Sequence, residues 1–579
     1  MSSKYERYRS VDHVLPDRAW AWNMYGAGLE NIGRGGQPEQ LPIADPADDQ
    51  LLARIDCVGL CFSDLKVVKQ GSSHPKLYGR DLSRYPARLG HEVSLTIVKV
   101  GKGLQDRYRP CQRFAVQPDI YQNGKNTAYG YTVPGGLIQY QLIGPEVLQT
   151  DEGACLLPLP AGLGYAETAL LEPWGCVVAA YTQRRRLQPR PGGTLWIVGR
   201  PGDERAYIDS AGLAAPAVIV LTDAPASVRA MAETAGAGQV VARDGVGPAG
   251  YAALAEEFTG GQGFDDIVAL DPRSAAAVGA MARHIARRGI LNLVGETPLD
   301  GLVDADVGRL HYDYIVFAGN RGPDIAASYG EARNRCRLRP GGTAVFLGAG
   351  GPMGQMHVQL ALELPGGPAQ VIASEVSEER LAALRERFSP LAAQKGRRLA
   401  LVNPSGGHAS LHDLVMEATG GRGADDVVVC VPVAALMAEG AGLMNADGML
   451  VAFAGVPNGT LAPLDLSQVY LGSAQFSGTS GLTIKDQAWV LQRAAEGSLS
   501  PGRSVAAIGG LDAAVQGIEA MMNGRYPGKI VIFPQLPALP LLGLDELSAR
   551  LPQVAEKLGP GNVWTAEAEA ALFEAAWQG

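Results

Sequence analysis

The stretch AVFLGAGGPMGQMHVQLAL (344–362), followed by VIASEVSEERL (371–381), decides the fold of this chain of 579 residues. Each part begins with a short apolar run of strand character, and a glycine-rich turn joins the first run to a segment of helical period. A strand, a helix and a second strand in close succession are typical of a parallel sheet with crossover helices. The stretch therefore predicts a Rossmann-like, doubly wound α/β unit.

The glycine-rich turn predicts a dinucleotide site. Backbone N–H groups at a helix N-terminus bind a pyrophosphate, and missing side chains let it approach. Glu375 ends the second strand 21 residues after Gly354, close to the ~20 expected of a carboxylate that binds the adenosine ribose hydroxyls, which favours NAD over NADP. The glycine spacing is irregular, and such turns are also ordinary packing devices. The predicted cofactor-binding residues are Gly348, Gly350, Gly351, Met353, Gly354 and Glu375.

An internal repeat predicts a second unit of the same kind upstream. RNRCRLRPGGT (333–343) matches RRRLQPRPGGT (184–194), and TGGRGADDVVVC (419–430) matches TGGQGFDDIVAL (259–270). GMLVAFAG (448–455) likewise matches GILNLVG (289–295), and FSGTSG (476–481) matches FAGNRG (317–322). Four matches in the same order predict two tandem Rossmann-like units.

The first copy has a degenerate glycine turn, VGRPGDERAYIDSAGL (198–213). Arg205 replaces the last glycine, and Asp203 and Glu204 place negative charge at the expected helix start, which disfavours phosphate. Asp223 still ends the second strand in the ribose-acid position. We interpret this copy as a structural or regulatory unit; a second nucleotide-type site is the alternative.

Composition excludes several classes of partner. The chain has 50 Lys and Arg against 59 Asp and Glu, a net charge of −9, so its field repels nucleic acid and anionic membranes. Seven scattered Cys without paired spacings argue against a disulfide framework and for a reducing compartment. No signal-peptide core and no run of ~20 apolar residues occurs. We expect a cytoplasmic protein that acts on a small molecule.

Three motifs precede the repeats: CVGLCFSD (57–64), LGHE (89–92) and LEPWGC (171–176). Together with the Rossmann-like units they resemble the zinc-dependent medium-chain dehydrogenases, the alcohol and polyol dehydrogenase family. The resemblance implies that Cys61, His91 and Glu172 bind the catalytic zinc. A thiolate, an imidazole and a carboxylate leave a fourth position on Zn²⁺ open to substrate. Cys176, one helical turn after Glu172, is the rival third ligand.

The resemblance also implies roles for three neighbouring residues. Ser63 would hand on the alcohol proton, Asp64 would orient the ligand His91, and Glu92 would enter the coordination sphere during ligand exchange. The chain departs from many members in lacking a four-Cys structural zinc lobe, since residues 111–143 hold one Cys, and in having Lys66 where some members carry a relay His. The phrases QPDIYQNG and GYTVPGGLIQY look most like the sorbose-phosphate-reductase branch.

The expected architecture is a GroES-like, mostly β catalytic domain split around two tandem Rossmann-like doubly wound domains. Strand-like pieces at 93–101 and 529–534 belong to the β domain. A helical tail after Pro534 could be a docking arm or a subunit contact. The expected boundaries are 1–183 for the catalytic domain, 184–332 for the first Rossmann-like domain, 333–481 for the second, NAD-binding one, 482–534 for the rest of the catalytic domain and 535–579 for the tail.

The combined prediction is an enzyme that uses zinc and NAD to transfer a hydride between the cofactor and a secondary alcohol of a polyol, sugar or sugar phosphate. The alternatives are an epimerase or lyase with tightly held NAD, and a nucleotide- or redox-sensing protein. A homo-oligomer, dimer or tetramer, is expected from the family. Arg184–Arg186 with Arg190 could hold a substrate phosphate, although a solvated basic helix end explains them as well.

Overall fold

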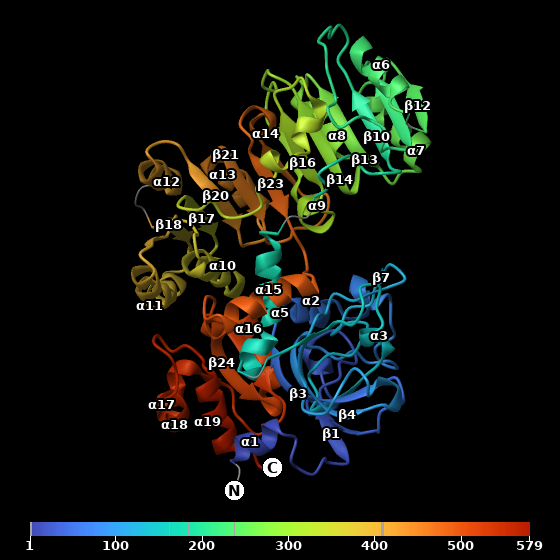
Figure 1. Cartoon of the computed structure of the whole chain (residues 1–579). Helices are drawn as coiled ribbons and strands as arrows, with labels where there is room; N and C mark the ends of the chain where they lie inside the picture. Colours follow the sequence, from blue (N-terminus) through green and yellow to red (C-terminus); the bar gives the residue numbers. More distant parts are fainter. Residues whose placement is uncertain (1–2, 161, 183–184, 237, 407–409) are drawn as a thin grey trace. The chain divides into compact units, whose positions relative to one another are not determined.

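The computed structural model describes residues 3–160, 162–182, 185–236, 238–406 and 410–579. The chain forms two compact units. The first comprises Met1–Ala179, Gly351–Met356 and Gly481–Gly579, and the second comprises Ala180–Gly350 and His357–Ser480. Figure 1 follows the chain by colour, with the helices and strands labelled.

A mixed β sheet of eight strands forms the core of the first unit. Its strand order is β26-β24-β25-β3-β4-β5-β9, and β8 pairs with β3. All nine residues of β3 are buried, because its apolar residues belong to the core and its two charged residues, Arg54 and Asp56, pair with each other at 2.7 Å. The strands are β3 (Leu51–Gly59), β4 (Glu92–Val100), β5 (Arg113–Val116), β8 (Tyr140–Ile143), β9 (Leu156–Pro158), β24 (Val505–Gly510), β25 (Lys529–Phe533) and β26 (Leu542–Gly543).

The strands expected at 93–101 and 529–534 are confirmed as β4 and β25, which both pair antiparallel with β3. Residues from the two ends of the chain therefore share one sheet. The main helices of this unit are α2 (Phe62–Gln70), α4 (Tyr165–Ala169), α5 (Leu171–Ala179), α15 (Ile484–Ala495) and α16 (Ala514–Met522).

The C-terminal tail docks on the unit that contains the N-terminus. Helix α19 (Ala566–Ala576) packs on α1 (Lys4–Arg9) and α4. The Glu574 carboxylate accepts hydrogen bonds from the backbone N–H groups of Lys4 and Tyr5, and the Phe573 ring lies 4.3 Å from that of Tyr8, centroid to centroid. Within one chain, the tail is thus a docking arm on its own β unit.

The second unit contains two six-stranded parallel sheets with the same topology. Their orders are β12-β11-β10-β13-β14-β16 and β19-β18-β17-β20-β21-β23, which is the doubly wound order 3-2-1-4-5-6 in each copy. The first sheet consists of β10 (Thr194–Val198), β11 (Val218–Thr222), β12 (Gln239–Ala242), β13 (Phe264–Leu270), β14 (Ile285–Val294) and β16 (Val316–Asn320). The second consists of β17 (Thr343–Leu347), β18 (Gln370–Ser374), β19 (Arg398–Val402), β20 (Ala424–Val429), β21 (Met444–Ala452) and β23 (Gln475–Gly478).

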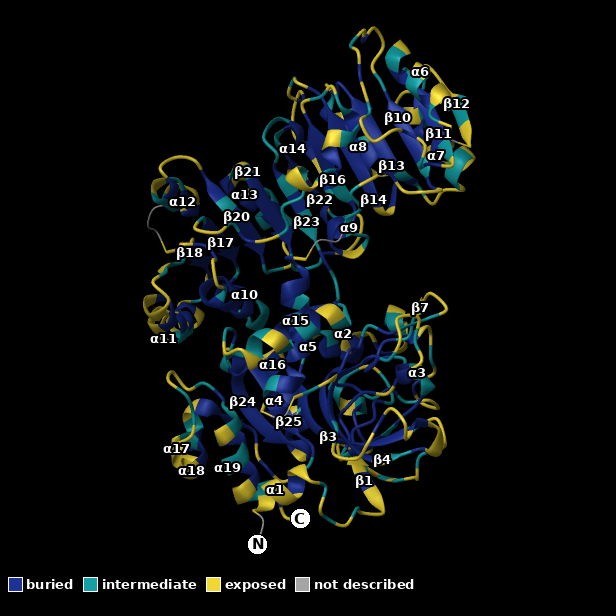
Figure 2. Ribbon diagram, in the orientation of Figure 1, coloured by how far each residue is buried: buried dark blue, intermediate teal, exposed yellow. Residues whose placement is uncertain are grey.

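Alternate side chains of β10 enter different cores, as a strand with two covered faces requires. Trp196 and Val198 pack with residues of α7 (Tyr251–Thr259) and α8 (Ala275–Ala282), whereas Leu195 and Ile197 pack with residues of α6 (Ala226–Thr234). The central strands are dark blue, that is buried, in both copies (Figure 2). The predicted α/β class with two Rossmann-like sheets is confirmed.

In both copies, two arginines of the first repeated stretch pair with the two aspartates of the DD dipeptide, an arrangement that we call the latch. In the first copy Arg186 pairs with Asp266 at 2.9 Å and Arg190 with Asp265 at 2.6 Å. The Asp265 carboxylate also accepts the N–H of Thr194, the first residue of β10. In the second copy the corresponding residues are Arg335 with Asp426, Arg339 with Asp425, and Thr343. The sequence repeat therefore reflects a repeated structural device that ties the start of the first strand to the fourth.

The first copy contradicts one prediction, because no helix follows its glycine turn. Residues 199–217, all of them described, form turns and loop between β10 and β11. Pro201, Pro216 and several glycines interrupt the segment, and such residues disfavour a helix interior. Tyr207 and Leu213 of this loop are buried in the core beside Leu195. The expected helix start at Asp203 and Glu204 is wrong.

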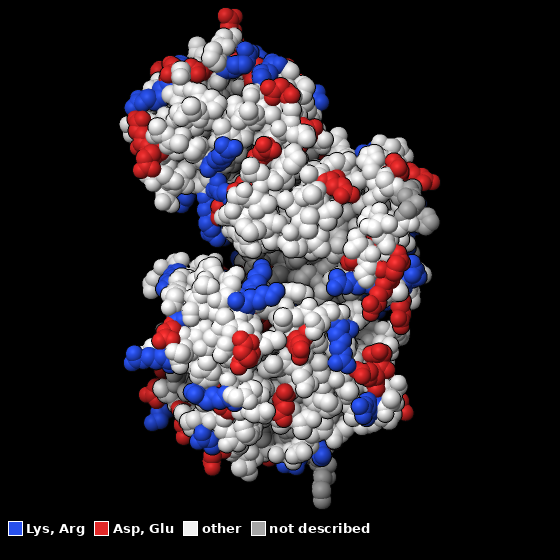
Figure 3. Space-filling model, turned by 180° about the vertical axis from the view of Figure 1, so that it is seen from behind, with Lys and Arg blue, Asp and Glu red and all other residues white. Residues whose placement is uncertain are grey.

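Charged side chains of both signs are mixed over the face drawn in Figure 3. Among the helices that the structure describes, none has both the length and the apolar character needed to span a bilayer.

Candidate metal centre and cofactor turn

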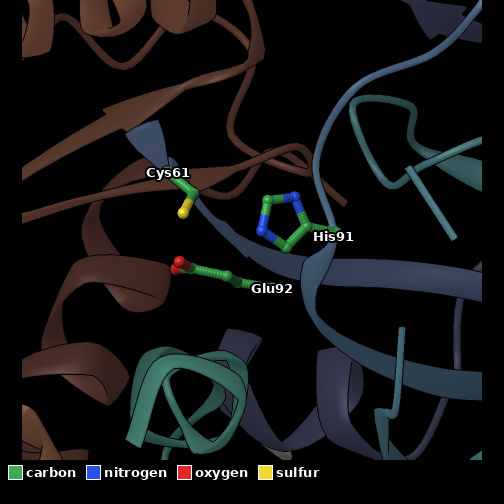
Figure 4. A group of neighbouring side chains, drawn as sticks. All are labelled: Cys61, His91 and Glu92. Atoms are coloured by element: carbon green, nitrogen blue, oxygen red, sulfur yellow. The ribbon is translucent and has the colours of Figure 1, made fainter. Parts of the chain in front are cut away.

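Cys61, His91 and Glu92 form a cluster of potential metal ligands at one end of the central sheet. Cys61 follows β3 and is the N-cap residue of α2, while His91 and Glu92 stand at the start of β4, where Glu92 pairs with Gly59 of β3. One ligand atom from each of the three side chains lies within 4.8 Å of the others. Figure 4 shows the sulfur and the carboxylate ending close together, with the imidazole beside them. A thiolate, an imidazole and a carboxylate suit zinc.

Asp64 holds this cluster in place. Its Oδ1 lies 3.2 Å from Nδ1 of His91, so Nε2 of the ring stays available to a metal ion. The same carboxylate accepts the N–H groups of Cys61 at 3.0 Å and Gly90 at 3.2 Å. Although burial acts in the opposite direction, His91 and these hydrogen bonds lower the pKa of Asp64. Asp64 is therefore ionised and orients both ligands.

Glu172, the predicted third ligand, is not a member of the cluster of Cys61, His91 and Glu92, whose ligand atoms lie within 4.8 Å of one another. It stands in the first turn of α5 and is 5% exposed. Burial raises its pKa to about 7, while His91 and Lys529 act to lower it, which indicates a buried carboxyl group within electrostatic reach of the imidazole. Cys176 Sγ donates to Glu172 Oε1 over 3.7 Å, so the rival ligand lies directly beside it.

Lys529 is a residue of this site that sequence reasoning missed. Its Nζ donates to Glu92 Oε1 and, at 2.7 Å, to the carbonyl oxygen of Leu60. Both charged side chains are almost completely buried, while Glu92 Oε2 has no hydrogen-bond partner among the described residues. A lysine at the start of the buried strand KIVIF was the available signal, because a buried Lys needs an anionic partner.

A second group that sequence reasoning missed lies beside His91. The Tyr131 ring is 5.6 Å from the His91 ring and 5.4 Å from that of His74, between centroids. Lys76 Nζ lies 4.9 Å from the Tyr131 ring centroid and 3.2 Å from Asp119. These aromatic and polar groups could contact a hydroxylated substrate.

Ser63 and Lys66 lie on the first two turns of α2. Ser63 is partly exposed and Lys66 is exposed. Burial, together with Lys76 and Lys66, lowers the pKa of His74 to about 4, so that ring is neutral at pH 7.

The cofactor turn of the second copy has the predicted strand, turn and helix. β17 ends at Leu347, residues 348–351 form the turn, and α10 (Pro352–Glu363) begins with a proline, which suits the first helical position. Met353 and Gly354 belong to the first turn of α10. A Cβ at Gly348, whose φ is +72°, would lie 2.3 Å from Val431, whereas one at Gly351 would meet open space.

Glu375 holds this turn directly. Its Oε2 accepts the N–H of Gly350 at 3.1 Å, and its Oε1 accepts those of Val376 and Ser377. A Cβ at Gly350 would lie 2.4 Å from Glu375 Oε2 and 2.8 Å from Arg380 Cβ, so a larger residue there would displace the Glu375 carboxylate. The acid therefore stands at the carboxyl end of β18 beside the turn, as the dinucleotide pattern expects.

In the first copy, ion pairs fill the corresponding place. Asp271, which directly follows β13 and is 1% exposed, pairs with Arg200, Arg205 and Arg273 at 2.8–3.0 Å. Asp223 Oδ1 accepts the N–H of Gly245 at 3.0 Å. The Asp271 ion pairs thus occupy the place that would face a pyrophosphate, whereas Asp223, like Glu375 of the second copy, accepts a backbone N–H group.

The arginine cluster considered for a substrate phosphate has structural contacts instead. Arg184 lies outside the described residues. Arg185 Nε donates to Asn334 Oδ1 at 2.8 Å, and Arg186 and Arg190 form the latch described above. Arg185, Arg186 and Arg190, which the structure describes, lie between α5, which ends at Ala179, and β10, and belong to no helix.

Two family models match this chain and define its class. Residues 47–176 match the alcohol dehydrogenase GroES-like domain, and residues 352–496 match the zinc-binding dehydrogenase domain. These matches and the fold define an oxidoreductase with a GroES-like catalytic part and a Rossmann cofactor part. The two matched domains are those of the zinc-dependent medium-chain dehydrogenases, the alcohol and polyol dehydrogenase family, and they support this assignment for the chain.

Two curated relatives match this chain over nearly their whole length. The L-sorbose 1-phosphate reductase of Klebsiella pneumoniae is 23% identical over 536 residues, which are 91% of this chain and 92% of the relative. The mannitol-1-phosphate 5-dehydrogenase of Aliivibrio fischeri is 22% identical, again covering 91% and 92%. Among solved structures, the 2R,3R-butanediol dehydrogenase of Bacillus subtilis aligns with a TM-score of 0.50 at 16% identity, over 89% of this chain and 99% of that one.

Proposed function

We propose that this protein is a zinc- and NAD-dependent dehydrogenase that transfers a hydride between NAD(H) and a secondary alcohol or ketone of a polyol, sugar or sugar phosphate. The observation that carries the proposal is the convergence of Cys61, His91 and a buried carboxylate at the ends of β3 and β4. The two relatives of full length act, by their names, on sugar or polyol phosphates, which supports this substrate class.

Each residue of the site has a defined task in this proposal. Cys61 and His91 bind the metal, and either Glu172 or Glu92 provides the carboxylate; we keep Glu172 as the third ligand and Glu92 as the exchanging one. Zinc, when bound, polarises the substrate oxygen, and NAD accepts the hydride. Asp64 fixes the His91 ring, and Ser63 passes the alcohol proton to solvent.

The cofactor assignment rests on the second copy. Gly348, Gly350, Gly351, Met353 and Gly354 would accommodate the pyrophosphate, and Glu375 would bind the ribose hydroxyls. The same carboxylate repels a 2′-phosphate, which favours NAD. We also propose the domain boundaries 183/184, 332/333, 481/482 and 534/535. We further propose a cytoplasmic location and a homo-oligomer, and light scattering after gel filtration measures the oligomeric state.

The test combines a metal assay with a substrate screen. We expect the purified protein to contain zinc and to reduce NAD with at least one polyol or sugar phosphate. Cys61→Ala should lose both zinc and turnover, whereas Cys336→Ala, at a partly buried cysteine of the second unit, should keep both. A zinc-free wild-type protein, together with unchanged turnover for Cys61→Ala, would refute the proposal.

A further inference from the structure

The two Rossmann-like copies pair through equivalent strands. β15 (Val303–Asp306) follows β14 in the first copy, and β22 (Leu461–Leu464) follows β21 in the second. They are antiparallel, with Val303 opposite Leu464 and Asp306 opposite Leu461. The first residue of each strand thus faces the last residue of the other, which is the register of a two-fold axis.

A helix and an edge strand of each copy also make equivalent contacts with the other copy. A Cβ at Gly319 of β16 would lie 2.8 Å from Tyr470 Cβ in α14 (Ser467–Leu471), and one at Gly478 of β23 would lie 2.8 Å from the Leu310 carbonyl in α9 (Val307–Tyr312). Leu310 and Tyr470 are each the fourth residue of their helix, and each glycine is the third residue of its repeat, FAGNRG or FSGTSG. The repeated glycines therefore allow each copy's helix to approach the other copy's edge strand.

Buried polar contacts and a shared core complete this surface. Ser467 Oγ accepts the N–H of Leu299 at 3.0 Å, and Tyr470 donates to the Thr297 carbonyl at 2.6 Å. Phe317 of the first copy and Phe476 of the second belong to one continuous core. Such a self-complementary patch is what two identical subunits present to each other in a symmetric dimer, and here one chain supplies both halves.

The first copy has also lost the features that bind a dinucleotide. It has no helix after β10, and the ion pairs of Asp271 with Arg200, Arg205 and Arg273 lie at the carboxyl ends of β10 and β13. This is the switch point where a Rossmann sheet normally places its ligand.

We propose that the first Rossmann-like unit is a tethered partner of the second. It occupies, within one chain, the surface through which the second unit would otherwise pair with another copy of itself, and it binds no dinucleotide. One chain therefore has one NAD site, and any homodimer uses a different surface.

A cysteine pair tests the pairing. Asp304 and Pro463 are exposed and directly opposite each other in β15 and β22, so the variant Asp304→Cys/Pro463→Cys should form a disulfide within one chain upon mild oxidation at low protein concentration. Non-reducing gels and peptide mass spectrometry detect it. The control Asp304→Cys/Leu461→Cys, two residues out of register, should form it far less. A covalent dimer, or no disulfide in the first variant, would overturn the pairing.

Cofactor stoichiometry tests the second part independently of the first. Equilibrium dialysis of the zinc-loaded protein with NADH should give one NADH per chain. Asp223→Ala, in the first copy, should bind NADH with unchanged affinity. Two NADH per chain, or at least a tenfold loss of NADH affinity in Asp223→Ala, would overturn the claim that the first unit binds no dinucleotide. The disulfide test does not require cofactor binding, so failure of the proposed NAD chemistry would be recognised separately.

Discussion

Lys529 and Glu92 form an ion pair in which both side chains are nearly inaccessible to solvent, 4% and 0% exposed. Two charges removed from water are tolerated only when each partner compensates the other. The pair also joins β25 to β4 across the end of β3, so it fixes the carboxylate that lies beside Cys61 and His91.

We expect Lys529→Met to lower the free energy of unfolding by about 3–5 kcal/mol, because Glu92 is left buried without its cation. Denaturant unfolding of the metal-free protein measures this. Lys529→Met/Glu92→Gln should recover much of the loss. Lys99→Met, which breaks an exposed pair with Asp45, should change stability by no more than about 0.5 kcal/mol. A loss under about 1 kcal/mol in Lys529→Met would contradict this account.

In the proposed site, Glu375 would determine which cofactor the second copy prefers. We expect Glu375→Gln to reduce the preference for NAD over NADP about tenfold, equivalent to ~1.4 kcal/mol, because the neutral amide no longer repels a 2′-phosphate. Its single oxygen can accept either from Gly350 or from Val376 and Ser377, but not from both sides as the carboxylate does. Comparing kcat/KM for the two cofactors measures it. Glu379→Gln, an exposed neighbour in α11 (Glu378–Gln394), should leave the preference unchanged. An unaltered ratio in Glu375→Gln would remove Glu375 from the site.

At the scale of elements, helix α19 shows how the end of the chain stabilises the β unit. Glu569 is fully buried, and its carboxylate accepts the N–H groups of Tyr165 and Ala166 at the start of α4. Burial nevertheless raises its pKa to about 7, although these hydrogen bonds act to lower it. The contact is therefore sensitive to pH.

The sign of this sensitivity follows from the direction of the shift. A carboxyl group whose folded pKa is above its unfolded value of 4.5 destabilises the fold when ionised. The cost is absent below about pH 4.5, grows up to about pH 7 and is complete above it. We expect the stability of Glu569→Gln relative to wild type to improve by about 2–3 kcal/mol between pH 5 and pH 8. Urea unfolding across this range measures it. For the exposed control Glu567→Gln, the difference in free energy of unfolding from wild type should not change between pH 5 and pH 8. If that difference were also constant for Glu569→Gln, the raised pKa of Glu569 would be contradicted.

The elements themselves were predictable to different degrees. β4 and β25 were expected because apolar runs bounded by turns depend on local patterning. The loop after β10 was mistaken for a helix, because its place in the repeat suggested one. Prolines and glycines in that loop disfavour the helix that the repeat led us to expect. Tyr207 and Leu213 of the loop cover the sheet in its place.

At the scale of the whole molecule, the proposed metal ligands and the proposed cofactor residues come from different elements: the ligands stand at the ends of β3 and β4 and in α5, and the cofactor residues stand between β17 and α10 and after β18. Metal removal should therefore abolish turnover without abolishing cofactor binding. We expect 1,10-phenanthroline followed by dialysis to reduce turnover at least about a hundredfold, zinc to restore it, and magnesium, which prefers oxygen ligands, to fail. NADH fluorescence titration should still show binding to the metal-free protein. Full turnover in protein shown to be zinc-free would contradict the metal centre.

The sequence by itself determined the fold class, the repeat and the residues Cys61, His91 and Glu172 as one proposed set, because motifs and strand patterns are local and survive in a single chain. It also marked Gly319 and Gly478 as repeated, without revealing what they approach.

Only the tertiary structure decided which groups meet across long separations in the chain. It paired Lys529 with Glu92, placed Glu172 outside the tightest ligand cluster, and set Tyr131 between His91 and Lys76 as a neighbour of both. It also joined β15 to β22. Such contacts depend on how sheets bring distant segments together, and that packing cannot be inferred from the spacing of residues along a single sequence.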